Sequence, residues 1–318
     1  MSELTYRPAT PDDAPFAADV RTQVRPSAPV DPRVLRHEWA EPHAGFVFSP
    51  YVVLRADDPI GVADFDHPRW ERTPERFGAI GGELLPAQRD AETLDAVLAE
   101  MERRLVAEGV RTVAVRANED DTMRIGVVEG RGFREDRRAK RWELDLVANR
   151  ERIVGLAEES RARMAAQGVR LMTLAEFGKP DRFEQIWRVS VEAERDVPTT
   201  LPPIEETVED YVRWFESPDI REDRCWVGVE HDQIVGLSLL HYPPVRGVVG
   251  TAWTATARAV RGRGIARAVK CETLIEAIAL GVDRVRTGND AANEPILHIN
   301  AAMGYQAIAG GINFLKDL

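Results

Sequence analysis

The sequence predicts an α/β protein of two tandem domains, each with a mixed, mostly antiparallel central sheet flanked by helices. The helix-glycine-strand segment LDAVLAEMERRLVAEGVRTVAV recurs later as ARAVKCETLIEAIALGVDRVRT. The glycines that end these two helices, Gly109 and Gly281, lie 172 residues apart, and so do Phe133 and Tyr305. Two landmarks at one offset indicate a duplication of about half the chain.

The first half opens with a strand at 4–10 and a helix at 11–24. YVVLRA and GVADFD follow as strands around the turn signal at 57–59, as a hairpin requires. A helix then ends at Gly109, and a Val-rich strand is expected at 110–115. GRGFRED, at 130–136, leads into the last strand. The order is therefore β-α-α-β-β-β-α-β-α-β.

The second half repeats this order. A strand at 169–175 and a helix at 176–192 precede CWVGVE and QIVGLSLL, which flank the turn at 231–233. A strand at 251–257, a helix at 264–280 and a strand at 282–287 complete the shared pattern. The expected division is a first domain at 1–147, a linker helix at 148–168 and a second domain at 169–318.

Composition narrows the function. The net charge of the 318 residues is -11, which disfavours the extended basic face that nucleic acids need. No run of about 18 apolar residues predicts a membrane span, and the start of the chain resembles no signal peptide. Only two cysteines, Cys225 and Cys271, are present and the histidines are scattered, so we expect no disulfide and no metal site. This use of cysteine fits a cytoplasmic protein. We expect a monomer or a homodimer.

The stretch VRGRGIARAVK, residues 260–270, predicts an anion site. It follows a strand and opens a helix, where unpaired backbone N–H groups and the helix dipole attract negative charge. Arginines in and beside it add charge-assisted bonds. It lacks the GK[ST] of a P-loop and the third small residue of a dinucleotide fingerprint. An ordinary arginine-rich helix start is the plain alternative.

A family resemblance suggests which anion. RGRGIA resembles the pyrophosphate loop of the GNAT superfamily of acyl-CoA-dependent N-acyltransferases, usually Arg/Gln-x-x-Gly-x-Gly/Ala. The matching residues are Arg261, Gly262, Arg263, Gly264, Ile265 and Ala266. The spacing from Asn293 to Gly304 and Tyr305 also resembles the family's ending. The motif match covers about 248–310, and the tandem plan is similar to that of mycothiol synthases.

The resemblance implies acetyl-CoA as co-substrate. The strand before the loop and the next strand would splay apart, and the pantetheine arm would lie between them. Backbone groups from Thr254 through Thr256 to Ala257 would bind that arm, and Asn293 would lie near the coenzyme. The acyl group would pass directly to an amine without a covalent enzyme intermediate.

The catalytic residues are less well defined. Many family members carry an acidic tyrosine where this chain has Asn300, which cannot serve as a proton source. Glu192 and Asp196 are candidate bases, four residues apart and on one face if the helix continues. A solvated helix end is their alternative explanation. Further candidates are Glu194, Glu230, His241 and, less favoured, His298.

The first half lacks the loop. At the same offset stands RDAETL, residues 89–94, in which Asp90 and Glu92 replace both glycines. We therefore expect no coenzyme in this half, which would form an intramolecular pseudo-dimer with the second. The predicted function is an N-acetyltransferase acting on the amine of a small molecule or peptide. A non-catalytic acyl-CoA sensor and a purely structural module are the alternatives.

Overall fold

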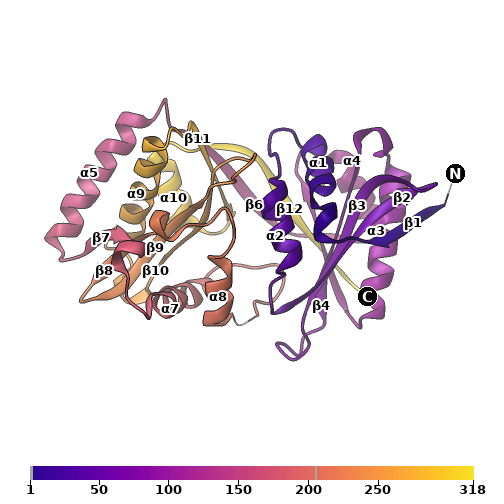
Figure 1. Cartoon of the computed structure of the whole chain (residues 1–318), viewed down its shortest axis with the longest axis horizontal. Helices are drawn as coiled ribbons and strands as arrows, with labels where there is room; N and C mark the ends of the chain where they lie inside the picture. Colours follow the sequence, from indigo (N-terminus) through magenta and orange to yellow (C-terminus); the bar gives the residue numbers. More distant parts are fainter. Residues whose placement is uncertain (1–2, 205) are drawn as a thin grey trace.

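The computed structural model describes residues 3–204 and 206–318 and contains one continuous sheet (Figure 1). The sheet has 12 strands in the order β1-β2-β3-β4-β5-β12-β6-β11-β10-β9-β8-β7. Two of its neighbouring pairs, β4 with β5 and β10 with β11, are parallel. In the described part of the chain, no helix is long and apolar enough to cross a membrane.

The first half has the expected order of elements. They are β1 (Leu4–Pro8), η1 (Pro11–Asp13), α1 (Ala14–Val24), α2 (Pro32–Ala40), β2 (Phe46–Arg55), β3 (Asp58–Pro68), β4 (Phe77–Leu84), η2 (Pro86–Gln88), α3 (Ala91–Ala107), β5 (Thr112–Asn118), α4 (Thr122–Gly130) and β6 (Arg134–Asp145). The helix α5 (Arg150–Ala166) follows and packs against the second half.

The second half repeats the plan, which confirms the predicted fold class. Its elements are β7 (Arg170–Thr173), α6 (Leu174–Phe177), α7 (Arg182–Glu194), α8 (Val208–Trp214), η3 (Glu222–Arg224), β8 (Trp226–Glu230), β9 (Gln233–His241), β10 (Gly250–Thr256), η4 (Arg258–Val260), α9 (Ile265–Ala279), β11 (Arg284–Asp290), α10 (Glu294–Met303) and β12 (Gln306–Asp317). The single helix expected at 176–192 is in fact two. Gly178 ends α6 with a left-handed φ of 59°, and Pro180 lies between this glycine and the start of α7.

The duplicated glycines have the same backbone role in both halves. Gly109 and Gly281 end α3 and α9 with φ values of 86° and 76°, in the left-handed region that glycine adopts without strain. The strands after them begin at Thr112 and Arg284, two residues later than expected, because the chain must first leave the helix. The 172-residue spacing between Gly109 and Gly281 therefore reflects the same helix-ending turn in both halves.

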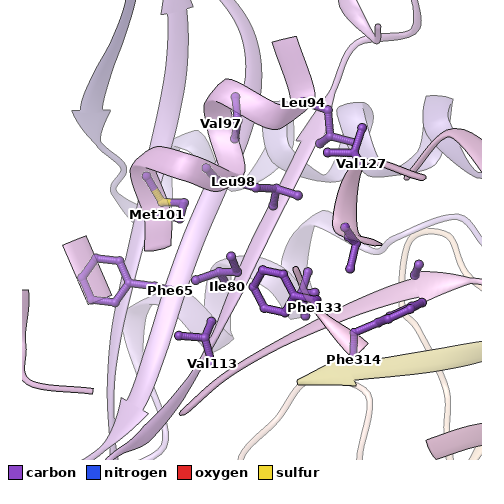
Figure 2. Packing of buried hydrophobic residues seen from close by; sticks show 14 of the residues in the cluster. Phe65, Ile80, Leu94, Val97, Leu98, Met101, Val113, Val127, Phe133 and Phe314 are labelled. Atoms are coloured by element: carbon purple, nitrogen blue, oxygen red, sulfur yellow. The ribbon is translucent and has the colours of Figure 1, made fainter. Parts of the chain in front are cut away.

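The halves exchange their last strands. β12, from the second half, pairs with β5 and β6, whereas β6, from the first half, pairs with β11. Phe314 on β12 is only 1% exposed and joins the core of the first half with Phe133 and Val127 (Figure 2). The division at 147 and 169 remains a prediction, since the sheet runs unbroken across both halves.

Helices cover both faces of the sheet. In the second half, Leu240 on β9 packs with Leu274 of α9, whereas its neighbour Leu239 packs with Ile186 of α7. The alternation of side chains along a strand thus separates the α9 face from the α7 and α8 face. In the first half, α3 covers one face and α1 and α2 the other. Both faces contribute to the cleft described next.

Candidate active site

The strands β10 and β11 separate soon after they meet. Their only Cα register pair is Gly250 with Arg286, although β10 continues to Thr256 and β11 to Asp290. Neighbouring strands in a sheet otherwise lie about 5 Å apart. The two strands therefore form a fork that opens toward their carboxyl ends, the slot in which the resemblance expects a pantetheine arm.

A glycine turn lies at the mouth of this fork. Gly262 and Gly264 have left-handed φ values of 77° and 92°, which side chains rarely adopt. Gly264 is the N-cap of α9, and no side chain caps the helix there. The first backbone N–H groups of α9 are thus available to an anion, and the helix dipole adds to their attraction.

The arginines of the turn are held by carboxylates. Arg261 and Arg258 both pair with Asp196, at 2.5 and 2.7 Å. Arg263 instead pairs with Glu230 at 2.8 Å and donates to Gln167, so its side chain is directed to β8 and α5 rather than to the slot. The two pairs with Asp196 are exposed to water, so Arg258 and Arg261 can change partners at little cost in free energy.

The two candidate bases from the sequence sit over the same turn. The helix α7 ends at Glu194, so Asp196 lies beyond it and does not share a helix face with Glu192. Glu192 accepts the backbone N–H of Arg258 at 2.7 Å. Hydrogen bonds from Arg261 and Arg258 hold the pKa of Asp196 below its usual value. Both carboxylates therefore fix the turn in this structure.

The other predicted residues divide between the slot and the core. Thr254, Thr256 and Asn293 line the cleft, as do Arg261, Gly262, Gly264, Ile265 and Ala266. Asn300 is fully buried and donates from Nδ2 to Asn289 at 2.9 Å. Asn300 therefore does not line the cleft itself, but its hydrogen-bond partner Asn289 does.

The cleft has a volume of about 2400 Å³ and is lined by both halves. From the second half it takes the fork, the glycine turn and residues of α8 and α10. From the first half it takes residues of α1, α2, β3, β5 and β6. One space therefore connects the turn at α9 with the middle of the 12-stranded sheet.

A histidine–aspartate pair faces this cleft at the end of β9. His241 Nδ1 lies 2.8 Å from Asp219 Oδ2, and Asp219 Oδ1 accepts the hydroxyl of Ser217 at 2.5 Å. Burial opposes ionisation of Asp219, but the hydrogen bond and charge of His241 hold its pKa below the usual value. The contact of His241 with Asp219 involves Nδ1, so Nε2 is the ring nitrogen that remains for a second partner. The sequence offered His241 as a candidate but gave no sign of its partner.

A lysine lies at the base of the fork. Lys270 on α9 is 1% exposed, lines the cleft, and its Nζ is 3.2 Å from Thr251 Oγ1, next to the only β10–β11 register pair. The same ammonium lies 5.2 Å from the ring of Tyr305, which is buried. Burial lowers the pKa of Lys270 to about 8. The sequence signal was a lysine inside the largely apolar helix segment IARAVKCETLIEAIA.

The corresponding features of the first half are filled. Asp90 caps α3 by accepting the N–H of Thr93 at 2.8 Å. The pairing of β4 and β5 ends at Ile80 with Val115, and beyond it Arg124 bridges the strands by donating to Gly82 O and Arg116 O, each at 2.7 Å. A carboxylate thus occupies the helix start, and a guanidinium group occupies the gap between the strands.

Two halves of this design, with a forked strand pair and a glycine turn in the second, define the tandem GNAT fold. A tandem GNAT protein from the clavulanic acid biosynthesis pathway, solved without AcCoA, is similar with a TM-score of 0.75 and 15% identity, over 99% of this chain and 98% of that one. A GCN5-related N-acetyltransferase from Sphaerobacter thermophilus is similar with a TM-score of 0.68 and 18% identity, over 99% and 95%.

A third similar structure is a GCN5-related glucosamine N-acetyltransferase region of a fungal multi-domain GH3 beta-N-acetylglucosaminidase. Its TM-score is 0.69 at 12% identity, and the match spans 99% of this chain but only 38% of that longer one. No sequence profile of a known family matches this chain, and no curated protein sequence does.

Proposed function

We propose that this protein is an acyl-CoA-dependent N-acyltransferase with one active site, in its C-terminal half, that moves an acetyl group from acetyl-CoA to the amine of a small molecule or peptide. The observation that carries the proposal is the fork between β10 and β11 with an uncapped glycine turn at its mouth. An extended arm and a pyrophosphate fit these two features together.

In this proposal the coenzyme is held mainly by the backbone. The pyrophosphate accepts from the first N–H groups of α9, beside Gly262 and Gly264, because no Cβ stands in its way. Arg261 and Arg258 transfer from Asp196 to the phosphate oxygens. The pantetheine arm follows β10 past Thr256 and Thr254, with Asn293 on the other side. No metal is required.

His241 is the proposed general base. The acceptor arrives as an ammonium ion, and Nε2 of His241 removes its proton, directly or through a water molecule. Asp219 orients the ring and stabilises the imidazolium that forms. The free amine then attacks the thioester carbonyl carbon. This assignment replaces Glu192 and Asp196, whose carboxylates are bonded to the turn.

Lys270 is the proposed partner of the leaving group. When the tetrahedral intermediate collapses, the carbon–sulfur bond breaks and the sulfur leaves as a thiolate. An ammonium group at the base of the fork stabilises that thiolate and can protonate it, the task of the family's tyrosine, which this chain lacks. The attacking nitrogen still carries one proton more than the amide keeps, and this proton passes to water as the intermediate collapses. The products are the amide and coenzyme A.

The first half has a supporting role in this proposal. It forms a pseudo-dimer with the second half through the shared sheet and supplies one wall of the acceptor cleft. Asp90 and Arg124 keep a second coenzyme out. We expect a monomer or homodimer that works in the cytoplasm.

Titration with acetyl-CoA by calorimetry, followed by an assay of thiol release with an amine panel, tests the function. We expect one molecule per chain and amine-dependent release of thiol. Gly264→Asp should abolish binding, because its carboxylate caps α9 and repels the pyrophosphate. Gly109→Asp is the matched control, since Gly109 has a similar φ of 86° and open space around it but lies away from the cleft.

The outcomes separate the alternatives. Binding without thiol release on a broad panel favours an acyl-CoA sensor. Absence of binding by the wild-type protein, or equal binding by the Gly264→Asp and Gly109→Asp variants, overturns the proposed coenzyme site.

A further inference from the structure

Three arginines of the first half converge on one wall of the cleft. Arg25 follows α1, Arg116 lies on β5 and Arg141 on β6, and all three line the cleft. Arg25 and Arg141 both donate to the side-chain oxygen of Asn118, Arg141 at 2.7 Å. Arginines from three separate elements thus lie close together; we call them the arginine cluster.

No carboxylate of the described residues forms an ion pair with the cluster, although the charge of Arg116 acts to lower the pKa of Asp66, which burial and Asp64 raise to about 7. Within the described residues, none of its guanidinium groups makes an ion pair within 4.0 Å. The nearby Arg21 and Arg137 do, with Asp64 and Asp290. Burial and the charges of Arg25 and Arg116 hold the pKa of Arg141 below its usual value, although Asp120 and Glu119 act in the opposite direction. Crowded like charges without a counterion are costly unless an anion joins them.

The cluster lies beside the proposed site of acyl transfer. Arg141 pairs in register with Gly288 of β11, one arm of the fork. Its Cα therefore lies one strand spacing, about 5 Å, beyond β11. An acceptor that places its amine at the fork can reach a guanidinium group of the cluster within about 10 Å, two such spacings. This is the length of a small molecule.

Carboxylates line the cleft near β9, three strands away from β6 in the sheet. Asp219 stays ionised there beside His241, and Glu38 on α2 lies close enough to sense the charges of both. All three residues line the cleft. The cleft therefore offers an ionised carboxylate near β9, where an ammonium group would be received. The three guanidinium groups of the cluster lie near β5 and β6, on a wall that Asp64 and Asp66 of β3 also line.

We infer that the acceptor is a small zwitterion, an amine that also carries a carboxylate, and that the arginine cluster binds the carboxylate. This inference rests on the proposed function for the amine and on the cluster itself for the anion. Planar guanidinium groups bind carboxylates with paired, charge-assisted hydrogen bonds. The ammonium end then points to the fork and to His241.

The first test needs no turnover. Glutarate, a dicarboxylate without an amine, is titrated by calorimetry into the full-length protein saturated with coenzyme A. We expect binding to the wild-type protein that Arg141→Gln weakens about tenfold or more. Arg134→Gln, on the same strand but 82% exposed, is the matched control and should leave binding unchanged. Arg25→Gln provides a second variant should Arg141→Gln fold poorly.

The second test compares ω-amino acids, from glycine to 6-aminohexanoic acid, with their amides as acceptors. The acids should be favoured in kcat/KM by about tenfold or more, and Arg141→Gln should remove that preference by raising KM for the acids alone. Equal rates for acids and amides, or glutarate binding that is absent or unchanged in both cluster variants, overturn the inference. Glutarate binding without any turnover would instead count against the transferase and leave the carboxylate site standing.

Discussion

At the scale of single residues, Lys270 has the most unusual environment. Its side chain is buried in α9 and has Thr251 and the ring of Tyr305 as polar neighbours rather than a carboxylate. A buried cation without a counterion destabilises a folded protein. Such a cost is common where a group serves catalysis, because activity and stability then set opposite demands on one side chain.

Lys270→Met should make the protein more stable and less active. The pKa falls from 10.5 to about 8 on folding, so the charged form costs roughly 3 kcal/mol. Because the unfolded chain binds the proton more strongly, wild-type stability should rise with pH between about 8 and 10.5. The variant should be more stable by about this amount at pH 7, should lack that rise, and should turn over about 100-fold more slowly.

Urea denaturation at pH 7 and pH 10, with Lys140→Met as an exposed control, measures the first two effects. Wild-type turnover should also decline above about pH 8, as Lys270 loses its proton. Equal stability of the Lys270→Met and Lys140→Met variants would show that the ammonium carries no such cost.

At the scale of elements, the end of α7 controls the glycine turn. Asp196, just beyond α7, forms salt bridges with both Arg258 and Arg261. A carboxylate therefore holds the two guanidinium groups that a pyrophosphate would need. In the proposed function, coenzyme binding has to break these exposed pairs. We therefore expect Arg258 and Arg261 to change partner from Asp196 to the pyrophosphate on binding.

Asp196→Asn should bind acetyl-CoA a few-fold more tightly and keep its turnover at saturating substrate, because it frees the arginines without touching the base. His241→Gln should instead leave the affinity for acetyl-CoA unchanged and reduce turnover about 100-fold, because it removes the proposed base. Calorimetry and the thiol assay measure both quantities. Loss of turnover in Asp196→Asn alone would return the role of general base to Asp196.

Local sequence signals predicted the elements well. Helix-ending glycines and hairpin turns fixed the order in both halves, and the turn residues Asp57 and Asp232 indeed have positive φ. The glycine turn was also visible, since glycine spacing at a helix start is a local property. The His241–Asp219 pair was not, because loop and strand bring together residues 22 positions apart. The arginine cluster is still less local, since it joins α1, β5 and β6.

At the scale of the whole molecule, the exchanged strands make the halves depend on one another. Pairing of β12 with β5 joins residues nearly two hundred positions apart, so no local pattern could predict it. Phe314 and Ile312 bring apolar side chains of the second half into the first half's core. Two domains that share core residues in this way should unfold together.

Phe314→Ala should lower the free energy of unfolding by about 3–5 kcal/mol, because a large buried side chain is lost. The loss should appear in one cooperative transition that both halves report. Hydrogen exchange, followed separately for β3 and β9, checks this, with Leu318→Ala as an exposed control in the same segment. Two transitions, of which only one shifts, would show that the halves are independent.

The exchanged strand also has a consequence for how the protein is made. The first half emerges from the ribosome long before residues 306–317 are made, yet its strands β5 and β6 are joined only through β12. Until residues 306–317 have been made, β5 presents an open edge to other nascent chains, the kind of edge that invites mispairing. Two chains whose β5 edges have already met could each then pair β12 with the other chain, which would form an entangled dimer. Slow or stalled translation of residues 306–317 should therefore harm this protein more than one built from two self-contained domains.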